Sequence, residues 1–96
     1  MTNTQKLVKA INFISRHSIH DLSTKFFVKD DIPHKISGYF YDYHKGNQTI
    51  TNSDEIGEEE AESFINSSLI QNLLHDALIA QEQKAARELR LAKFYE

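Results

Sequence analysis

The sequence predicts a small α+β domain in which a three-stranded antiparallel sheet packs against helices. The expected order is α-β-β-β-α-α, with a long C-terminal helix. Apolar residues recur at helical spacing near the start and over the last third of the chain, whereas the middle alternates between apolar and polar residues, as strands do. The chain has 96 residues, of which 40% are hydrophobic, so residues 1–96 are treated as one domain.

The first helix is expected to begin at a capping box, because Thr2 is followed three residues later by Gln5. Apolar positions then recur at helical spacing from Leu7 to about residue 19. A short strand over 25–29 leads into Asp30-Asp31-Ile32-Pro33, where we expect a turn because proline cannot continue a central strand.

The clearest strand spans Ile36–Tyr43, and His44-Lys45-Gly46-Asn47 supplies hairpin turn chemistry before a further strand over 48–52. Since side chains alternate between the two faces of a strand, the pattern also predicts which residues face the helices. This expected helix-facing set consists of Phe26, Val28, Ile36, Phe40 and Ile50.

Helix is expected to resume near Ser53 or Asp54 as a short acidic helix. Ser68 with Gln71 forms a second potential capping box, which predicts a long helix from about 69 to 94. Such a helix would measure about 39 Å at 1.5 Å per residue, longer than the ~30 Å width of a domain of this size. We therefore divide the domain into a compact core, 1–80, and a helical extension, 81–96.

The α-β-β-β-α part of this order resembles the double-stranded-RNA-binding domains. In that family the last helix begins with a lysine-rich clamp on phosphates, whereas the matching place here reads Glu58-Glu59-Glu60-Ala61-Glu62. These carboxylates would repel an RNA backbone, so the resemblance covers the order of elements and not the function.

Composition excludes several kinds of chemistry. The chain has no Cys, hence no disulfide, thiolate nucleophile or zinc finger, and its three glycines form no phosphate-binding loop. We find no catalytic motif and expect a protein that is not an enzyme and binds no cofactor or metal. His17, His20 and Asp21 come nearest to a metal-binding corner, but we interpret them as the polar end of a helix. No apolar stretch reaches the ~18 residues of a membrane span, so we expect a cytoplasmic protein that does not enter membranes.

Charge is unevenly distributed along the chain. Residues 1–53 carry seven bases and four acids, residues 54–96 four bases and ten acids, and six of those acids lie within 54–62. We expect a protein partner to bind this acidic segment and the overhanging helix, with a homodimer as the second arrangement. The chain would then be an adaptor, regulator or inhibitor, such as a phage- or plasmid-type accessory protein that blocks a nucleic-acid-processing enzyme. The expected partner-binding residues are Glu55, Glu58, Glu59, Glu62, Arg87, Leu89, Arg90, Leu91, Phe94 and Tyr95.

The alternative function is nucleic-acid binding. On the side of the sheet away from the helices, the alternation places tyrosines and Phe27, Thr49 and Thr51 near several lysines. Bases stack on aromatic rings while lysines neutralise phosphates, so this face could hold a single strand. The residues expected to contact nucleic acid are Lys25, Lys29, Tyr39, Tyr41, Tyr43 and Lys45.

Overall fold

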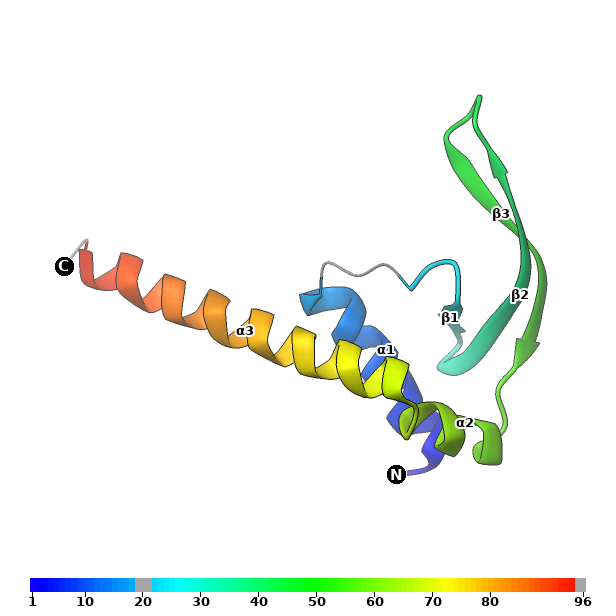
Figure 1. Ribbon diagram of the computed structural model, residues 1–96, viewed down its shortest axis with the longest axis horizontal. Coiled ribbons are helices and arrows are strands. Elements are labelled where there is room, and N and C mark those ends of the chain that lie inside the picture. Colours follow the sequence, from blue (N-terminus) through cyan, green and yellow to red (C-terminus); the bar gives the residue numbers. More distant parts are fainter. Residues whose placement is uncertain (19–21, 95–96) are drawn as a thin grey trace.

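The computed structural model describes residues 1–18 and 22–94, and side chains as far as Glu88. It confirms the predicted class: the sheet is antiparallel with strand order β1-β2-β3, and the chain order is α-β-β-β-α-α. Two elements extend away from the packed centre, the far end of α3 on one side and the β2–β3 hairpin on the other (Figure 1). The elements are α1 (Asn3–His17), β1 (Phe26–Lys29), β2 (Ile32–Asp42), β3 (Asn47–Glu55), α2 (Glu58–Ile65) and α3 (Ser68–Phe94).

The predicted capping box at the start of α1 is confirmed. The Thr2 hydroxyl accepts a hydrogen bond from the Gln5 N–H, and the Gln5 side chain accepts one from the Thr2 N–H at 2.9 Å. Leu7, Ile11 and Ile14 are buried, which fits one apolar stripe along the helix. Because its first turn is capped and its stripe is covered, α1 forms the centre of the fold.

The core lies between α1, α2, the first half of α3 and β1. Most of the residues that cover α1 come from the later part of the chain, after the hairpin. These are Ile56, Ala61, Ile70, Leu73 and Ala77, all buried together with Leu22 and Phe26. Among the described helices, none is both long and apolar enough to cross a membrane.

The expected turn over Asp30–Pro33 is shorter than predicted, and the prediction for Pro33 was wrong. Asp30 and Asp31 alone make the turn, with φ values of 53° and 60°, and Pro33 lies in the central strand β2. Its carbonyl accepts a hydrogen bond from the Ile56 N–H at 2.9 Å. In a strand, the N–H and C=O of one residue point to the same side. The missing N–H of Pro33 therefore faces the end of the β2–β3 ladder, which begins only at His34, and no ladder bond is lost.

The predicted assignment of side chains to the two sheet faces was wrong for the hairpin. Ile50 lies opposite Tyr39, and Phe40 lies opposite Thr49 and is 62% exposed. Ile50 and Phe40 therefore occupy opposite faces, because paired residues share a face. The hairpin register, which pairs Asp42 with Asn47, already places Phe40 opposite Thr49 and not beside Ile50. A register shift also inserts Ser37 into β2 before Gly38, which reverses the alternation of that strand, so Phe40 no longer shares the face of Ile36. Phe26 is buried as expected, and Val28 packs against the core.

The starts of the last two helices differ from the predictions: α2 begins later than predicted and α3 slightly earlier. β3 continues through Asp54 to Glu55, and α2 begins only after Gly57, its N-cap, so helix does not resume at Ser53 or Asp54. The predicted cap at Ser68 was also misplaced. The Ser67 hydroxyl accepts the hydrogen bond from the Ile70 N–H at 3.3 Å, so the capping hydroxyl lies one residue earlier.

Candidate functional site

The long helix α3 leaves the packed centre partway along its length. Its buried residues are Ile70, Leu73 and Ala77, and every side chain from Gln81 to Glu88 is exposed. The helical backbone continues to Phe94, which places about 21 Å of helix beyond Ala80 at 1.5 Å per residue. Figure 1 shows this end extending away from the other elements.

Apolar side chains are exposed where α3 separates from α1. Leu78 is 49% exposed and Ile79 39%, although leucine and isoleucine favour burial. Beside them lies a shallow groove of about 420 Å³ between α1 and α3, lined by Phe13, Gln71, Leu74, His75 and Leu78. Leu78 therefore belongs both to the exposed pair and to the lining of this groove, at the base of the projecting helix.

Of the residues expected on the far end of α3, Arg87 is exposed. The side chains of Leu89, Arg90, Leu91 and Phe94, and the whole of Tyr95, lie outside the described residues, so their role stays a prediction. Leu78 and Ile79 were not among the predicted partner-binding residues. The helical spacing of Leu78 with Ile70, Leu74 and Ala77 suggests a core position, and only the point where α1 ends shows that it is left uncovered.

The acidic segment is split between two elements, and Glu58 is engaged within the fold. Its carboxylate accepts hydrogen bonds from the N–H of Asn3 (2.8 Å) and from the hydroxyl of Thr4 (2.7 Å) at the start of α1. That helix end carries a partial positive charge, which a carboxylate complements. The Thr4 hydroxyl, followed by the Asn3 and Thr4 N–H groups, lowers the pKa of Glu58 below its usual value.

Glu60 is also held within the fold, by an ion pair with Lys35 of β2 at 2.6 Å. The hydrogen bond from Lys35 to Glu60 raises the pKa of that ammonium group. Glu59 and Glu62 are exposed on α2, and Glu55 is exposed at the end of β3. The structure thus gives internal roles to Glu58 and Glu60 and leaves Glu55, Glu59 and Glu62 facing solvent.

The hairpin carries the predicted tyrosines, which are exposed: Tyr39 by 53%, Tyr41 by 42% and Tyr43 by 87%. The rings of Tyr41 and Tyr43 meet edge to face with centroids 4.9 Å apart. Tyr39 lies opposite Ile50 and Tyr41 opposite Gln48, so Tyr39 and Tyr41 share their face with these two β3 residues. Thr49 lies opposite Phe40 and not with the tyrosines, contrary to the predicted grouping.

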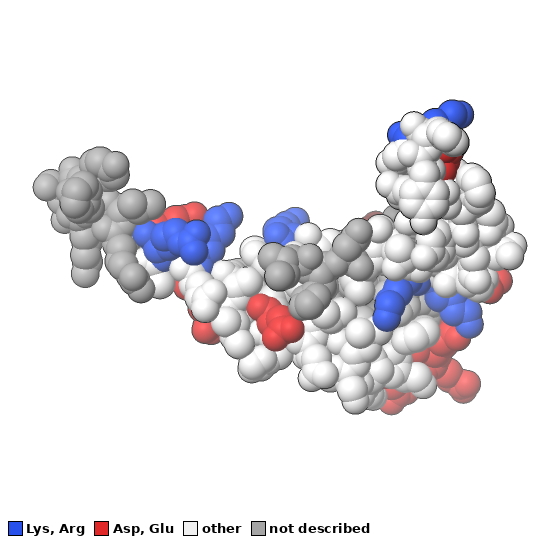
Figure 2. All heavy atoms as spheres, turned by 45° about the horizontal axis from the view of Figure 1, so that its top comes forward, with Lys and Arg blue, Asp and Glu red and all other residues white. Residues whose placement is uncertain are grey.

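Two of the three lysines predicted to contact nucleic acid, Lys25 and Lys29, are separated from the tyrosines. Lys29 lies opposite Ile32 at the far end of β2, about 30 Å along the strand from Tyr41 at 3.3 Å per residue. The carbonyl of Lys25 accepts a hydrogen bond from Ile36, before the first register shift. Lys45 alone of the three lies in the hairpin turn. Figure 2 likewise shows Lys and Arg side chains scattered over the face in view, several of them next to acids.

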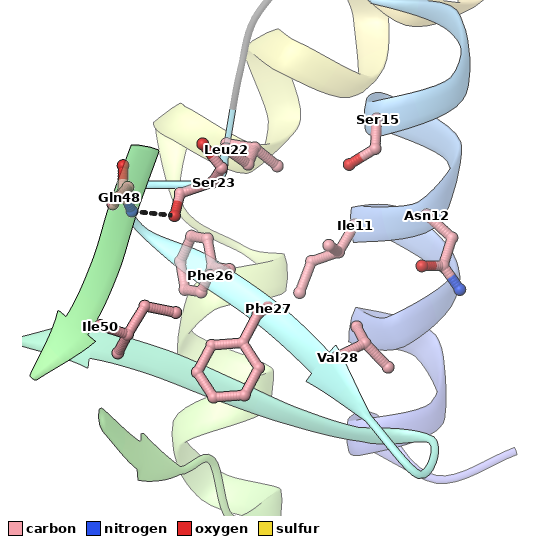
Figure 3. A pocket seen from close by; sticks show the side chains of 10 residues that line it. All are labelled: Ile11, Asn12, Ser15, Leu22, Ser23, Phe26, Phe27, Val28, Gln48 and Ile50. Carbon is pink, nitrogen blue, oxygen red and sulfur yellow. Dashed lines mark hydrogen bonds between the residues drawn. The ribbon is translucent and has the colours of Figure 1, made fainter. Parts of the chain in front are cut away.

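A cleft of about 480 Å³ lies between α1, β1 and the hairpin. Figure 3 shows Ile11 of α1, Phe26 and Phe27 of β1 and Ile50 of β3 around it. The Gln48 side chain donates a hydrogen bond to the Ser23 carbonyl at 3.0 Å across one end of the cleft. Its walls are mostly apolar, and none of the described residues that line it carries a charge.

The possible metal corner lies mostly outside the described residues, because His20 and Asp21 fall within 19–21. The His17 ring contacts Phe13 with centroids 4.6 Å apart. Within 1–18 and 22–94, no group of three or more His, Asp or Glu side chains could hold a metal ion.

Comparison with protein families, with curated proteins and with solved structures finds no match for this chain.

Proposed function

We propose that this chain is a non-enzymatic interaction protein, an adaptor, regulator or inhibitor, that binds a protein partner through α3. The observation that carries the proposal is the exposed stretch of α3 from Gln81 to Glu88, with Leu78 and Ile79 exposed at its base. An isolated helix gains little stability from its own sequence, and most helical stability comes from packing of an apolar face. A partner with an apolar groove would provide that packing, as in other helix-in-groove complexes.

Only part of the acidic segment supports this proposal. Glu59 and Glu62 on α2 are exposed, so they are available to a basic rim on the partner, whereas Glu58 and Glu60 serve the fold. Exposed charges at an interface act mainly on the rate of association. We propose that the chain is a phage- or plasmid-type accessory protein that acts in the cytoplasm. Its partner would be a nucleic-acid-processing enzyme, which it inhibits.

The experiment is affinity capture with the full chain and with a chain that ends after Ala80, followed by mass spectrometry. Circular dichroism first establishes that both chains are folded. We expect a partner that is captured by the full chain and lost with the shortened one. A folded shortened chain that captures the same partner equally well would contradict the proposal.

A finer test replaces two apolar side chains without altering charge. Leu78→Gln combined with Ile79→Gln should reduce capture of that partner about tenfold or more, because apolar anchors dominate such interfaces. The control, Gln81→Ala with Gln83→Ala, alters two exposed polar residues of the same helix and should leave capture unchanged. Equal losses in both variants would argue against apolar recognition.

Nucleic-acid binding is the second candidate, favoured by the exposure of Tyr39, Tyr41 and Tyr43 beside Lys45. Stacking of a base on an aromatic ring contributes about 1–3 kcal/mol. The test is fluorescence anisotropy with single- and double-stranded oligonucleotides at about 50 mM salt, where electrostatic binding is strongest. Binding that persists after Tyr39→Ala with Tyr41→Ala would exclude this face as the platform.

A further inference from the structure

Among the described residues, no helix or strand covers the outer edge of β3. β3 is the last strand of the sheet, and within the described chain β2 is the one element it contacts. Every residue of β3 except Gln48 is exposed. Natural edge strands are commonly protected by charged side chains, Pro, bulges or a covering element. β3 has no Lys and no Pro, no helix or strand of the described chain covers it, and its bulge at Thr51 and its acids Asp54 and Glu55 lie in its second half. Its outward N–H and C=O groups are therefore available to another strand.

The sequence of this strand is close to a palindrome. It reads Asn47-Gln48-Thr49-Ile50-Thr51-Asn52-Ser53, with threonines on both sides of Ile50 and carboxamides outside them. In an antiparallel pair of two copies centred on Ile50, each Thr49 would meet Thr51 of the second copy. Threonine pairs and pairs of β-branched residues are favourable cross-strand neighbours. Such self-complementarity is what a two-fold interface requires.

Charge favours the same arrangement. Asp54 and Glu55 lie at the end of β3, and Lys45 lies in the turn just before its start. Antiparallel pairing about Ile50 brings the acidic end of one β3, with Asp54 and Glu55, toward the turn of the second copy, which carries Lys45. A parallel pair would instead place the two acidic ends side by side, which is unfavourable.

We propose that β3 pairs antiparallel with β3 of a second copy of this chain, about a two-fold axis at Ile50, to form a six-stranded sheet. Ile50 is 39% exposed and lies opposite Tyr39, so the pairing would align Tyr39, Ile50 and the same two residues of the second copy in one row. A single strand pair buries less than the ~1,000 Å² of a stable interface, so the dimer dissociates in the micromolar range or above. This interface is separate from α3 and does not rest on the function proposed above.

Analytical ultracentrifugation of the full chain between about 5 and 500 µM measures the association directly. We expect a reversible equilibrium between monomer and dimer. A monomer at every concentration overturns the proposal.

Paired substitutions at two exposed positions of β3 test the register. Thr49→Lys with Thr51→Lys places two like-charged pairs across the axis and should weaken the dimer roughly tenfold. Thr49→Lys with Thr51→Glu places two opposite-charged pairs there and should restore or strengthen it, less so at high salt. If both variants weaken the dimer equally, residues 49 and 51 do not face each other and the proposal is wrong.

Further measurements test whether the β3 variants are folded and whether β3 itself forms the interface. Thermal unfolding by circular dichroism establishes that both β3 variants retain the fold, and isotope-filtered NMR of the unmodified chain should show contacts between Thr49 of one copy and Thr51 of the other. Leu78→Gln with Ile79→Gln should leave the dimer unchanged, since these residues lie on α3. A dimer abolished by the α3 variant would assign the association to that helix and overturn the β3 interface.

Discussion

Two regions extend from the packed centre, the far end of α3 and the β2–β3 hairpin. They differ in which groups, backbone or side chain, remain available for contact with a partner. In the helix the backbone N–H and C=O groups pair with one another, so only side chains are available for contact. In the hairpin the outer edge of β3 leaves backbone groups open, while its side chains are mostly polar. The difference indicates two kinds of partner, an apolar groove for the helix and a strand for the hairpin.

The largest effect is expected within α3, where we truncate one buried and one exposed apolar residue of its first half. Ile70→Ala should cost about 2–5 kcal/mol of unfolding free energy, because Ile70 is fully buried and leaves a cavity. Leu78→Ala should change it by less than about 0.5 kcal/mol, because Leu78 is 49% exposed. Urea unfolding measures both. A similar cost for the two would mean that Leu78, at the base of the projecting part, is packed like Ile70.

The hairpin is most sensitive at Gly38, where the two register shifts meet. A Cβ there would lie 2.9 Å from the Thr51 hydroxyl and 3.2 Å from the Asn52 side-chain nitrogen. Both side chains would have to move, so Gly38→Ala should destabilise the chain by about 1 kcal/mol. Urea unfolding measures the cost, and NMR shifts should locate the disturbance in β3. Ser37→Ala, at an exposed neighbouring residue, is the control and should have no such effect.

The packed centre has a pH-dependent contact at Glu58. Its pKa is lowered in the folded chain, above all by the Thr4 hydroxyl, so the ionised carboxylate favours folding. That contribution is present above the ordinary glutamate pKa of about 4.3 and is lost as the pH falls through the lower folded value. Glu58→Gln should therefore be less stable than the unmodified chain at pH 7. The gap should narrow toward pH 3.

Thermal unfolding at both pH values measures that gap. Glu59→Gln is the matched control, because Glu59 is exposed and the contacts found for Glu58 do not involve it. A gap that stays constant with pH would show that the Glu58 carboxylate does not favour the folded state.

The smallest effect on stability is expected at Glu59 and Glu62, the exposed acids of α2. Glu59→Gln with Glu62→Gln should change the unfolding free energy by only a few tenths of a kcal/mol, since Gln is almost as good a helix former. Association with a captured partner should slow, and its salt dependence should flatten between about 50 and 300 mM salt. Stopped-flow kinetics would measure this. Unchanged rates would mean that these acids are solvated and that α3 alone recognises the partner.

Much of the fold could be predicted from the sequence because local signals and tertiary packing agree. Thr2 and Gln5 form the predicted capping box, and the apolar spacing of Leu7, Ile11 and Ile14 is the buried stripe of α1. The length of α3 also followed from spacing and composition. In these segments one periodicity persists over several turns, which makes it easy to recognise.

The hairpin faces and the starts of α2 and α3 could not be predicted, because each depends on single residues. The register shifts at Gly38 reverse the alternation for the rest of the hairpin, and nothing in the strand pattern marks them in advance. Pro33 was expected in a turn because its position at the end of the β2–β3 ladder is a tertiary feature.

The candidate site was predicted only in part. The sequence indicates an acidic segment, but its division into structural and exposed carboxylates requires knowing that Glu58 meets the start of α1 and Glu60 meets Lys35. The exposure of Leu78 similarly depends on where α1 ends.

The apolar stripe of α1 is covered mainly by residues that follow the hairpin in the sequence, and this order has a consequence for biosynthesis. Ile14 leaves the ribosome long before Ile70 and Ala77, which bury the same stripe, and before Glu58, which completes the helix start. At a synthesis rate of about 5–20 residues per second, the first helix waits roughly 3–12 s for its packing partners. During that time its apolar face is open to chaperones and to other nascent chains, and the domain can fold only when most of the chain has been made.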